Sequence, residues 1–143
     1  RGRFTGKSTP AHLFWHSFDL ALTRFSGKAV EPREGAGMVE REAYSHEVIS
    51  FGFWFGDDKV PAPAFYSYTA PEPAGLTDEP LRPASAGWNT ANGAIAILMY
   101  DDVRGDEDPR VKILEFLESS YRAGAKTAEW DIEGFKLKPL KSE

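Results

Sequence analysis

Apolar and polar residues alternate along residues 44–55, YSHEVISFGFWF, and this alternation predicts a central β-strand. Most of the segment is β-branched or aromatic, and these side chains fit a pleated surface. Successive side chains of a strand point to opposite faces. One face therefore carries Ile49, Phe51, Phe53 and Phe55, with Glu47 near its start, and this composition indicates a core face.

The opposite face of this strand mixes a histidine, small residues and a tryptophan. His46 and Trp54 flank a gap formed by Ser50 and Gly52. Such a gap admits either a ligand or a neighbouring backbone, and close backbone approach is the more common reason for a glycine inside a strand. Because His46 and Glu47 point to opposite faces, we do not expect them to act as a pair.

Three further segments have strand character. Residues 12–25, HLFWHSFDLALTRF, fit either a helix, which would put His12 and His16 on one face, or a strand. The aromatic content and the turn sequence SGK that follows favour a strand for at least the second half. Residues 64–69, AFYSYT, predict a short strand, and the nearly continuous apolar run within residues 90–100 predicts a strand buried on both faces.

The helical pattern is clearest after residue 107. Asp108 is a good N-cap, and Pro109 suits the first helical position. An apolar stripe then follows at three- and four-residue steps: Leu114, Leu117, Tyr121, Ala125 and Ala128. Four strands followed by one helix predict an α+β fold, a mainly antiparallel sheet of about four strands with the C-terminal helix packed on one face.

A proline-rich segment, residues 71–87, separates the third and fourth expected strands. A connection of this length is typically an ordered surface loop, a short helix or a flap. If it is a flap, we expect it to close over a pocket on the sheet.

The composition is that of an ordinary globular chain. With 143 residues we expect a single domain over residues 1–143. The formal net charge of -5 and the lack of a Lys/Arg cluster argue against a nucleic-acid partner. The sequence contains no long apolar run, signal peptide or cysteine, so we expect no membrane span, no disulfide and a cytoplasmic location. It begins without methionine, which indicates a processed chain or part of a longer one.

Four ordered motifs, WHSFDLALTRFSG, YSHEVISFGFW, FYSYTAPEP and YDDVR, resemble an uncharacterised bacterial family of unknown function. The resemblance covers residues 4–130. Members of that family are about twice as long, in keeping with a second domain-sized segment, and carry these motifs in their C-terminal half. The resemblance therefore implies that this chain is such a C-terminal half, with the N-terminal half as a partner. It brings no established activity or cofactor, and His16 stands where the family commonly has glycine.

The histidines are the first candidates for chemistry. We consider His12 and His46 as catalytic acid–base residues, with His46 paired to His12 or Asp19 across neighbouring strands. Ordinary structural hydrogen bonds are the simpler alternative. A metal site would need carboxylates to assist the histidines, and the available ones are Glu42, Glu47, Asp19 and Asp101. Because no HExxH-type signature is present, we predict no metal site.

The aromatic residues suggest ligand binding. Tyr66 and Tyr68 share one face of their strand and can hydrogen-bond a ligand while stacking on it. Trp54 and Trp15 are the further candidates for lining such a pocket. Core packing is the alternative for each ring taken singly. The sequence carries no phosphate-binding loop, GxSxG elbow or nucleotide fingerprint, so no cofactor or reaction is indicated.

Two functional hypotheses follow. The first is a small-molecule-binding domain, either a binder or an enzyme, whose site combines His12, His46, Tyr66 and Tyr68 on the sheet. The second is a structural or interaction half-domain that pairs with the N-terminal half or with a second copy of itself. A closed pocket with converging polar groups favours the first, and a broad apolar face or a raw sheet edge favours the second.

Overall fold

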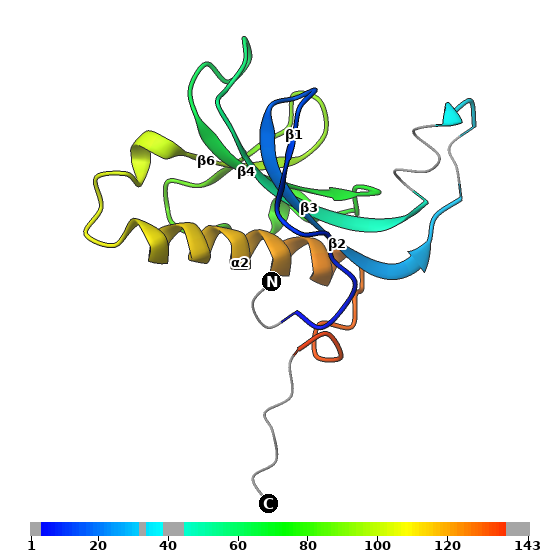
Figure 1. The fold of residues 1–143 in the computed structure, drawn as a ribbon. Coiled ribbons are helices and arrows are strands. Elements are labelled where there is room, and N and C mark those ends of the chain that lie inside the picture. The colour runs from blue at the N-terminus through cyan, green and yellow to red at the C-terminus, as the bar shows by residue number, and fades with distance from the viewer. Residues whose placement is uncertain (1–3, 32–33, 39–44, 137–143) are drawn as a thin grey trace, which may run out of the picture.

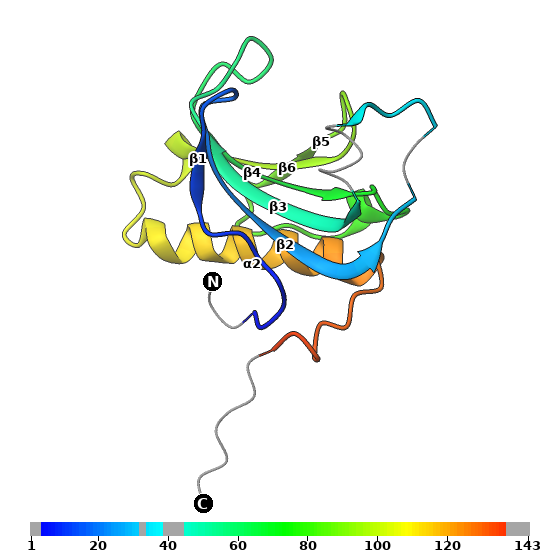
Figure 2. The same cartoon turned by 45° about the vertical axis from the view of Figure 1, so that its right-hand side comes forward.

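We describe the protein from a computed structural model, in which residues 4–31, 34–38 and 45–136 are described. A curved antiparallel sheet lies over one long helix, α2, which crosses beneath the sheet in both views (Figures 1 and 2). The helix covers one face of the sheet and leaves the other face open. The α+β class and the C-terminal helix are confirmed.

The sheet has six strands in the described part of the chain, where about four were expected. Their spatial order is β1-β2-β3-β4-β6-β5, and every neighbouring pair is antiparallel. The elements are β1 (His12–Phe14), β2 (Asp19–Ala29), β3 (His46–Trp54), β4 (Ala64–Ala70), η1 (Leu76–Asp78), β5 (Gly87–Asn89), β6 (Ile95–Met99), η2 (Tyr100–Asp102) and α2 (Pro109–Thr127).

Each of the two additional strands, β1 and β5, has three residues, too few to show an alternation in the sequence. The expected strand at residues 12–25 is in fact β1 and most of β2, joined by a tight turn at residues 15–18. This turn contains no glycine or proline, and Phe18 itself takes a left-handed conformation with φ of 52°. Such a conformation is rare for a bulky residue, so no turn was predicted there. β5 follows the proline-rich segment and holds only Trp88 between two small or polar residues.

The central strand β3 follows the predicted alternation over His46–Trp54, while Tyr44 lies outside the described residues. Ile49 and Phe51 are buried on the face that α2 covers, where they pack with Tyr121 and Trp130. The close approach of α2 depends on Gly124, because a Cβ there would lie 2.2 Å from Thr69 Oγ1. The expected core face of β3 is therefore the one that the helix covers.

The helix begins as predicted, because Asp108 Oδ1 accepts a hydrogen bond of 3.1 Å from the Val111 amide and Pro109 occupies the first turn. The predicted apolar stripe is partly wrong. Leu114 is 52% exposed, whereas Phe116 two positions later is fully buried against β6 and Val103. The buried face is thus turned toward Phe116 and Ala123, since the helix must also cover β6 and η1.

The proline-rich segment does not close over the open face of the sheet. Leu76 of η1 is buried against Ala94 and Ala123, and Glu79 pairs with Lys126 of α2 at 2.7 Å. The amide of Arg82 donates to Ser119 Oγ on the same helix. Of the three alternatives for this segment, the structure therefore shows an ordered loop with the short helix η1, because these contacts tie it to α2 and to Ala94.

Within the described residues, no helix has both the length and the apolar character needed to cross a bilayer.

Candidate functional site

The open face of the sheet is hollowed into a cleft of about 560 Å³. Its polar lining comes from Ser17, Asp19, Thr23, Ser50 and Asp57, and its aromatic lining from Phe14, Trp54, Tyr66 and Tyr68. Ala21, Gly56 and Ile95 complete the wall. The volume lies in the range of small-molecule sites, which are mostly apolar with a few placed polar groups.

The register of the sheet gathers these side chains. Across β2, β3 and β4, Ala21 pairs with Gly52, which pairs with Tyr66, and Thr23 pairs with Ser50. Directly paired residues share one face of an antiparallel sheet. Alternate positions of three neighbouring strands therefore line one cleft. Figure 2 shows these strands, β2, β3 and β4, side by side above α2.

Asp19 is the most buried charged residue of the cleft. It is only 7% exposed and opens strand β2 opposite Trp54. Its two carboxylate oxygens accept separate hydrogen bonds, Oδ1 from the Ser17 hydroxyl and Oδ2 from the Tyr66 hydroxyl. Both donors are neutral. None of the ion pairs found in the described part of the chain includes Asp19.

Tyr66 reaches Asp19 by crossing over Gly52. A Cβ at Gly52 would lie 2.4 Å from both the hydroxyl oxygen and Cζ of Tyr66, so only glycine leaves room for this ring. The gap predicted at Ser50 and Gly52 is therefore filled by a side chain of the next strand, rather than by a ligand or a backbone. Burial, assisted by the hydrogen bond to Asp19 and its negative charge, raises the pKa of the Tyr66 hydroxyl far above its usual range.

The aromatic residues form a continuous wall beside this pair. The rings of Tyr66 and Tyr68 are nearly parallel, with an interplanar angle of 6° and centroids 6.3 Å apart. Trp54 meets Tyr66 edge to face at 5.0 Å. At the floor, Thr23 and Ser50 share a hydrogen bond of 3.0 Å between their hydroxyls. Three of the four residues expected to bind a ligand, Trp54, Tyr66 and Tyr68, thus lie together.

The fourth expected residue, Trp15, is placed elsewhere. It lies in the turn between β1 and β2 and is 81% exposed, outside the lining of the cleft. This turn lies beside the loop that joins β3 to β4 (Figure 1), where the rings of Phe18 and Phe55 are 5.7 Å apart. Trp15 therefore belongs to a separate exposed apolar surface.

The two candidate catalytic histidines are not brought together. His12 pairs with Ala21, whereas His46 pairs with Ala29 at the other end of β2, about 20 Å further along the sheet. The ring of His12 contacts the carbonyl of Pro10 at 2.9 Å, and that of His46 contacts the Ser45 hydroxyl at 3.0 Å. Neither lines the cleft. The considered pairing of His46 with His12 or Asp19 does not occur, because it assumed a shorter separation along the strands.

Among the described residues, no group of three or more His, Asp or Glu side chains is arranged to hold a metal ion. Glu42, one of the four carboxylates considered for such a site, lies outside the described residues. Asp101 instead pairs with Arg104 at 2.5 Å on the surface.

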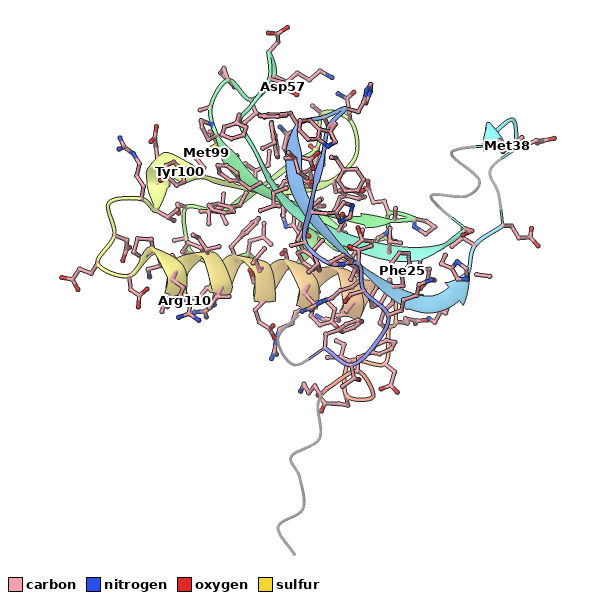
Figure 3. All side chains as sticks on the ribbon, in the orientation of Figure 1. Phe25, Met38, Asp57, Met99, Tyr100 and Arg110 are labelled. Atoms are coloured by element: carbon pink, nitrogen blue, oxygen red, sulfur yellow. The ribbon has the colours of Figure 1, made fainter. Side chains whose placement is uncertain are left out.

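Asp57 brings a second carboxylate to the mouth of the cleft. It lies in the loop between β3 and β4, on the side of the sheet away from α2 (Figure 3). Its Oδ1 accepts hydrogen bonds from the amides of Lys59 at 2.9 Å and Val60 at 2.8 Å. These bonds hold the pKa of the Asp57 carboxyl below its usual range.

Sequence reasoning missed the role of Asp19, Ser17 and Thr23. Strand alternation already placed Asp19 on one face with Ala21 and Thr23. What it lacked was the register that puts Tyr66 across Gly52. A buried-strand carboxylate followed by small and hydroxyl residues at every second position was the available signal.

Comparison with known proteins gives a family and nothing closer. No curated protein and no solved structure matches the chain. One family model matches residues 1–137, nearly the whole length, in agreement with the resemblance seen in the four motifs. The chain belongs to DUF5996, a family of unknown function.

Proposed function

We propose that this domain binds a small molecule in the cleft on the open face of its sheet. The observation that carries the proposal is the Asp19–Tyr66 pair, in which Asp19 is buried and Tyr66 half-buried although no helix or strand of the described residues covers that face. Ionisable groups with perturbed surroundings beside a cleft are characteristic of functional sites.

A purely structural role explains this arrangement less well. Burying a carboxylate costs free energy unless it is paired and hydrogen-bonded. Asp19 has hydroxyl donors but belongs to none of the ion pairs between described residues, and apolar residues of similar volume would pack that part of the sheet at lower cost. A group that is costly to keep and faces an open cleft supports a role in binding.

The geometry also indicates what the site can do chemically. Tyr66, with its raised pKa, stays protonated and donates its single O–H to Asp19, so towards a ligand its oxygen is an acceptor. Asp19 accepts, and the flat rings of Trp54 and Tyr68 offer stacking surfaces. We propose binding as the function and assign no reaction, and the two histidines outside the cleft receive no catalytic role in this proposal.

The experiment that tests the proposal is an NMR titration of the ¹⁵N-labelled protein with a library of small aromatic fragments. We expect shift changes that cluster on β2, β3 and β4 around Ser50 and Tyr66. Tyr68→Leu should weaken binding about tenfold, because stacking on a flat ring is lost. Leu114→Ser, on the exposed side of α2, is the matched control. Fragments that bind equally well to both variants, or that map to α2, would contradict the proposal.

A second function is favoured by a separate observation. Five large apolar residues around the β1–β2 turn are exposed: Leu13, Phe14, Trp15, Phe18 and Leu20. β1 is also one of the two edge strands of the described sheet. Exposed apolar side chains beside a sheet edge are typical of an interface. We therefore propose, as the alternative, that this surface contacts another protein segment, either the N-terminal half that the family resemblance implies or a second copy.

Sedimentation of the purified chain over a hundredfold concentration range tests this alternative. A second copy at the surface predicts dimers that Trp15→Ser dissociates, while Val111→Ser on the exposed side of α2 leaves them intact. A chain that stays monomeric at every concentration would exclude the second copy and leave co-purification with the N-terminal half as the decisive test.

A further inference from the structure

We infer that the cleft selects an organic cation, a ligand with an amine or ammonium head on an apolar or aromatic body. This inference rests on the proposed binding function and names the chemical class of the ligand. It follows from three features of the cleft: the sign of its charges, the hydrogen bonding and burial of the Asp19 carboxylate, and the aromatic residues of its walls.

The charged groups of the cleft all have one sign. Asp19 and Asp57 are its two charged lining residues, and no Lys, Arg or His lines it among the residues that the structure describes. The formal net charge of the whole chain, -5, has the same sign. A cleft lined by one sign of charge focuses the field and concentrates ligands of the opposite sign.

Asp19 is the stronger of the two determinants. Its hydrogen-bond partners Ser17 and Tyr66 are hydroxyl donors, which satisfy the carboxylate oxygens without neutralising their charge. The side chain is nearly withdrawn from water, so an added positive charge would be screened far less than at the surface. Asp57, in contrast, is exposed at the mouth and contributes mainly to attraction at longer range.

The walls of the cleft favour the same ligand. Trp54, Tyr66 and Tyr68 stand together beside Asp19, and Phe14 also lines the cleft. The face of an aromatic ring attracts a cation through its quadrupole, most strongly for tryptophan. A carboxylate beside several aromatic rings is thus suited to a charged head and an apolar body in the same molecule. An anionic ligand would meet repulsion from both carboxylates and find no cationic partner.

The test compares three probes that share one phenyl ring and differ in the head group. Phenethylamine is a cation at pH 7.5, 2-phenylethanol is neutral and phenylacetate is an anion. Affinities for the full chain are measured by isothermal titration calorimetry or by NMR titration. We expect the amine to bind about tenfold more tightly than the alcohol, because a charge-assisted hydrogen bond replaces a neutral one. Phenylacetate should bind most weakly.

Two variants locate the source of the preference. Asp19→Asn keeps the shape and an acceptor for Tyr66 but removes the charge, and should bring the amine to the affinity of the alcohol. Asp58→Asn removes a neighbouring surface charge that lies outside the cleft lining and should leave the preference unchanged. Amide spectra of both variants verify that the fold is retained.

The outcomes separate the inference from the proposed function. If amine and alcohol bind equally well to the cleft, the binding function stands and the cation preference is wrong. If the preference persists in Asp19→Asn, its source is not this carboxylate, and the inference is also wrong. If neither the three probes nor any aromatic fragment binds at millimolar concentration, both the cation preference and the proposed binding function are wrong.

Discussion

Strand β2 carries one charged side chain on each face, a half-buried Arg24 and a buried Asp19, and their surroundings differ. On the face covered by α2, the Arg24 guanidinium lies 4.5 Å from the ring centroid of Tyr121 and 4.7 Å from that of Phe4. Burial lowers the pKa of Arg24, against the opposing effect of Tyr121 and Glu118. On the open face, Asp19 is held by two hydroxyls at the edge of a cleft.

The two faces of the sheet differ in how they stabilise these charges. Rings from the N-terminal segment, β3 and α2 contact the half-buried Arg24 guanidinium, so part of its stabilisation comes from cation–π contacts within the fold. Both carboxylate oxygens of Asp19 accept hydrogen bonds, but no cationic side chain pairs with it among the described residues, and it lines the cleft. The covered face is therefore a packed core that includes a cation, and the open face is the one that we propose binds a ligand.

The largest expected effect breaks the covered face. Phe116→Ala removes a fully buried ring from the cluster with Leu98 and Val103, and should lower the free energy of unfolding by about 3–5 kcal/mol. Leu114→Ala, two residues earlier and half exposed, should cost about 1 kcal/mol or less. Urea unfolding followed by circular dichroism measures both. Similar losses for the two variants would mean that α2 is packed differently on the sheet.

A smaller effect is expected on the open face from Gly52→Ala. The added methyl group would meet the Tyr66 ring, so the ring must shift and its hydrogen bond to Asp19 must lengthen or break. We expect a loss of about 1–3 kcal/mol in the free energy of unfolding and weaker ligand binding.

Gly87→Ala in β5 is the matched control for this change, since a Cβ there meets nothing within 4 Å and the backbone needs no left-handed angle. It should leave both stability and binding nearly unchanged. If Gly52→Ala behaves like Gly87→Ala, Tyr66 does not occupy the space above Gly52.

The smallest effect concerns pH and sharpens the role of Tyr66. An unfolded tyrosine has a pKa of about 10, and burial raises the pKa of Tyr66 above this value in the folded state. At a pH above about 10, the folded state therefore keeps the Tyr66 proton while the unfolded state loses it. The resulting stabilisation is complete below pH 10 and is lost as the pH rises above it. Burial raises the pKa of Tyr121 too, so the comparison must isolate one ring.

Urea unfolding of the wild type and of Tyr66→Phe at pH 8.5 and pH 11 provides that comparison. The wild type should lose more stability than the variant over this interval, because the variant has lost only the Tyr66 titration. An equal loss in both proteins would show that Tyr66 is not shielded as the structure indicates.

Much of this fold was readable from the sequence, and the reason is periodicity. The alternation of β3, the apolar run of β6 and the cap at Asp108 each specify an element without knowledge of its neighbours. The short strands β1 and β5 were missed because three residues carry no period, and Phe18 occupies a turn position that glycine usually fills.

The site was only partly readable because it depends on register. Tyr66 and Tyr68 were identified from their residue type and spacing, and they do lie together. Asp19 was named as a possible partner of His46 and turned out to bond Tyr66 instead, 47 positions away in the chain. The sequence around Asp19 and around Tyr66 does not specify that Asp19 pairs with Trp54. That pairing belongs to the register of β2 on β3, which brings Asp19 to Tyr66.

Intermolecular nuclear Overhauser effects from bound phenethylamine to the aromatic rings of the protein would locate the ligand. If the cleft is the binding site, we expect contacts with the rings of Tyr66, Tyr68 and Trp54, and none with Phe116 on the covered face. Contacts confined to the exposed rings of Trp15, Phe18 and Phe55 would contradict it. They would show that the apolar turn, and not the cleft around Asp19, is the surface that receives ligands.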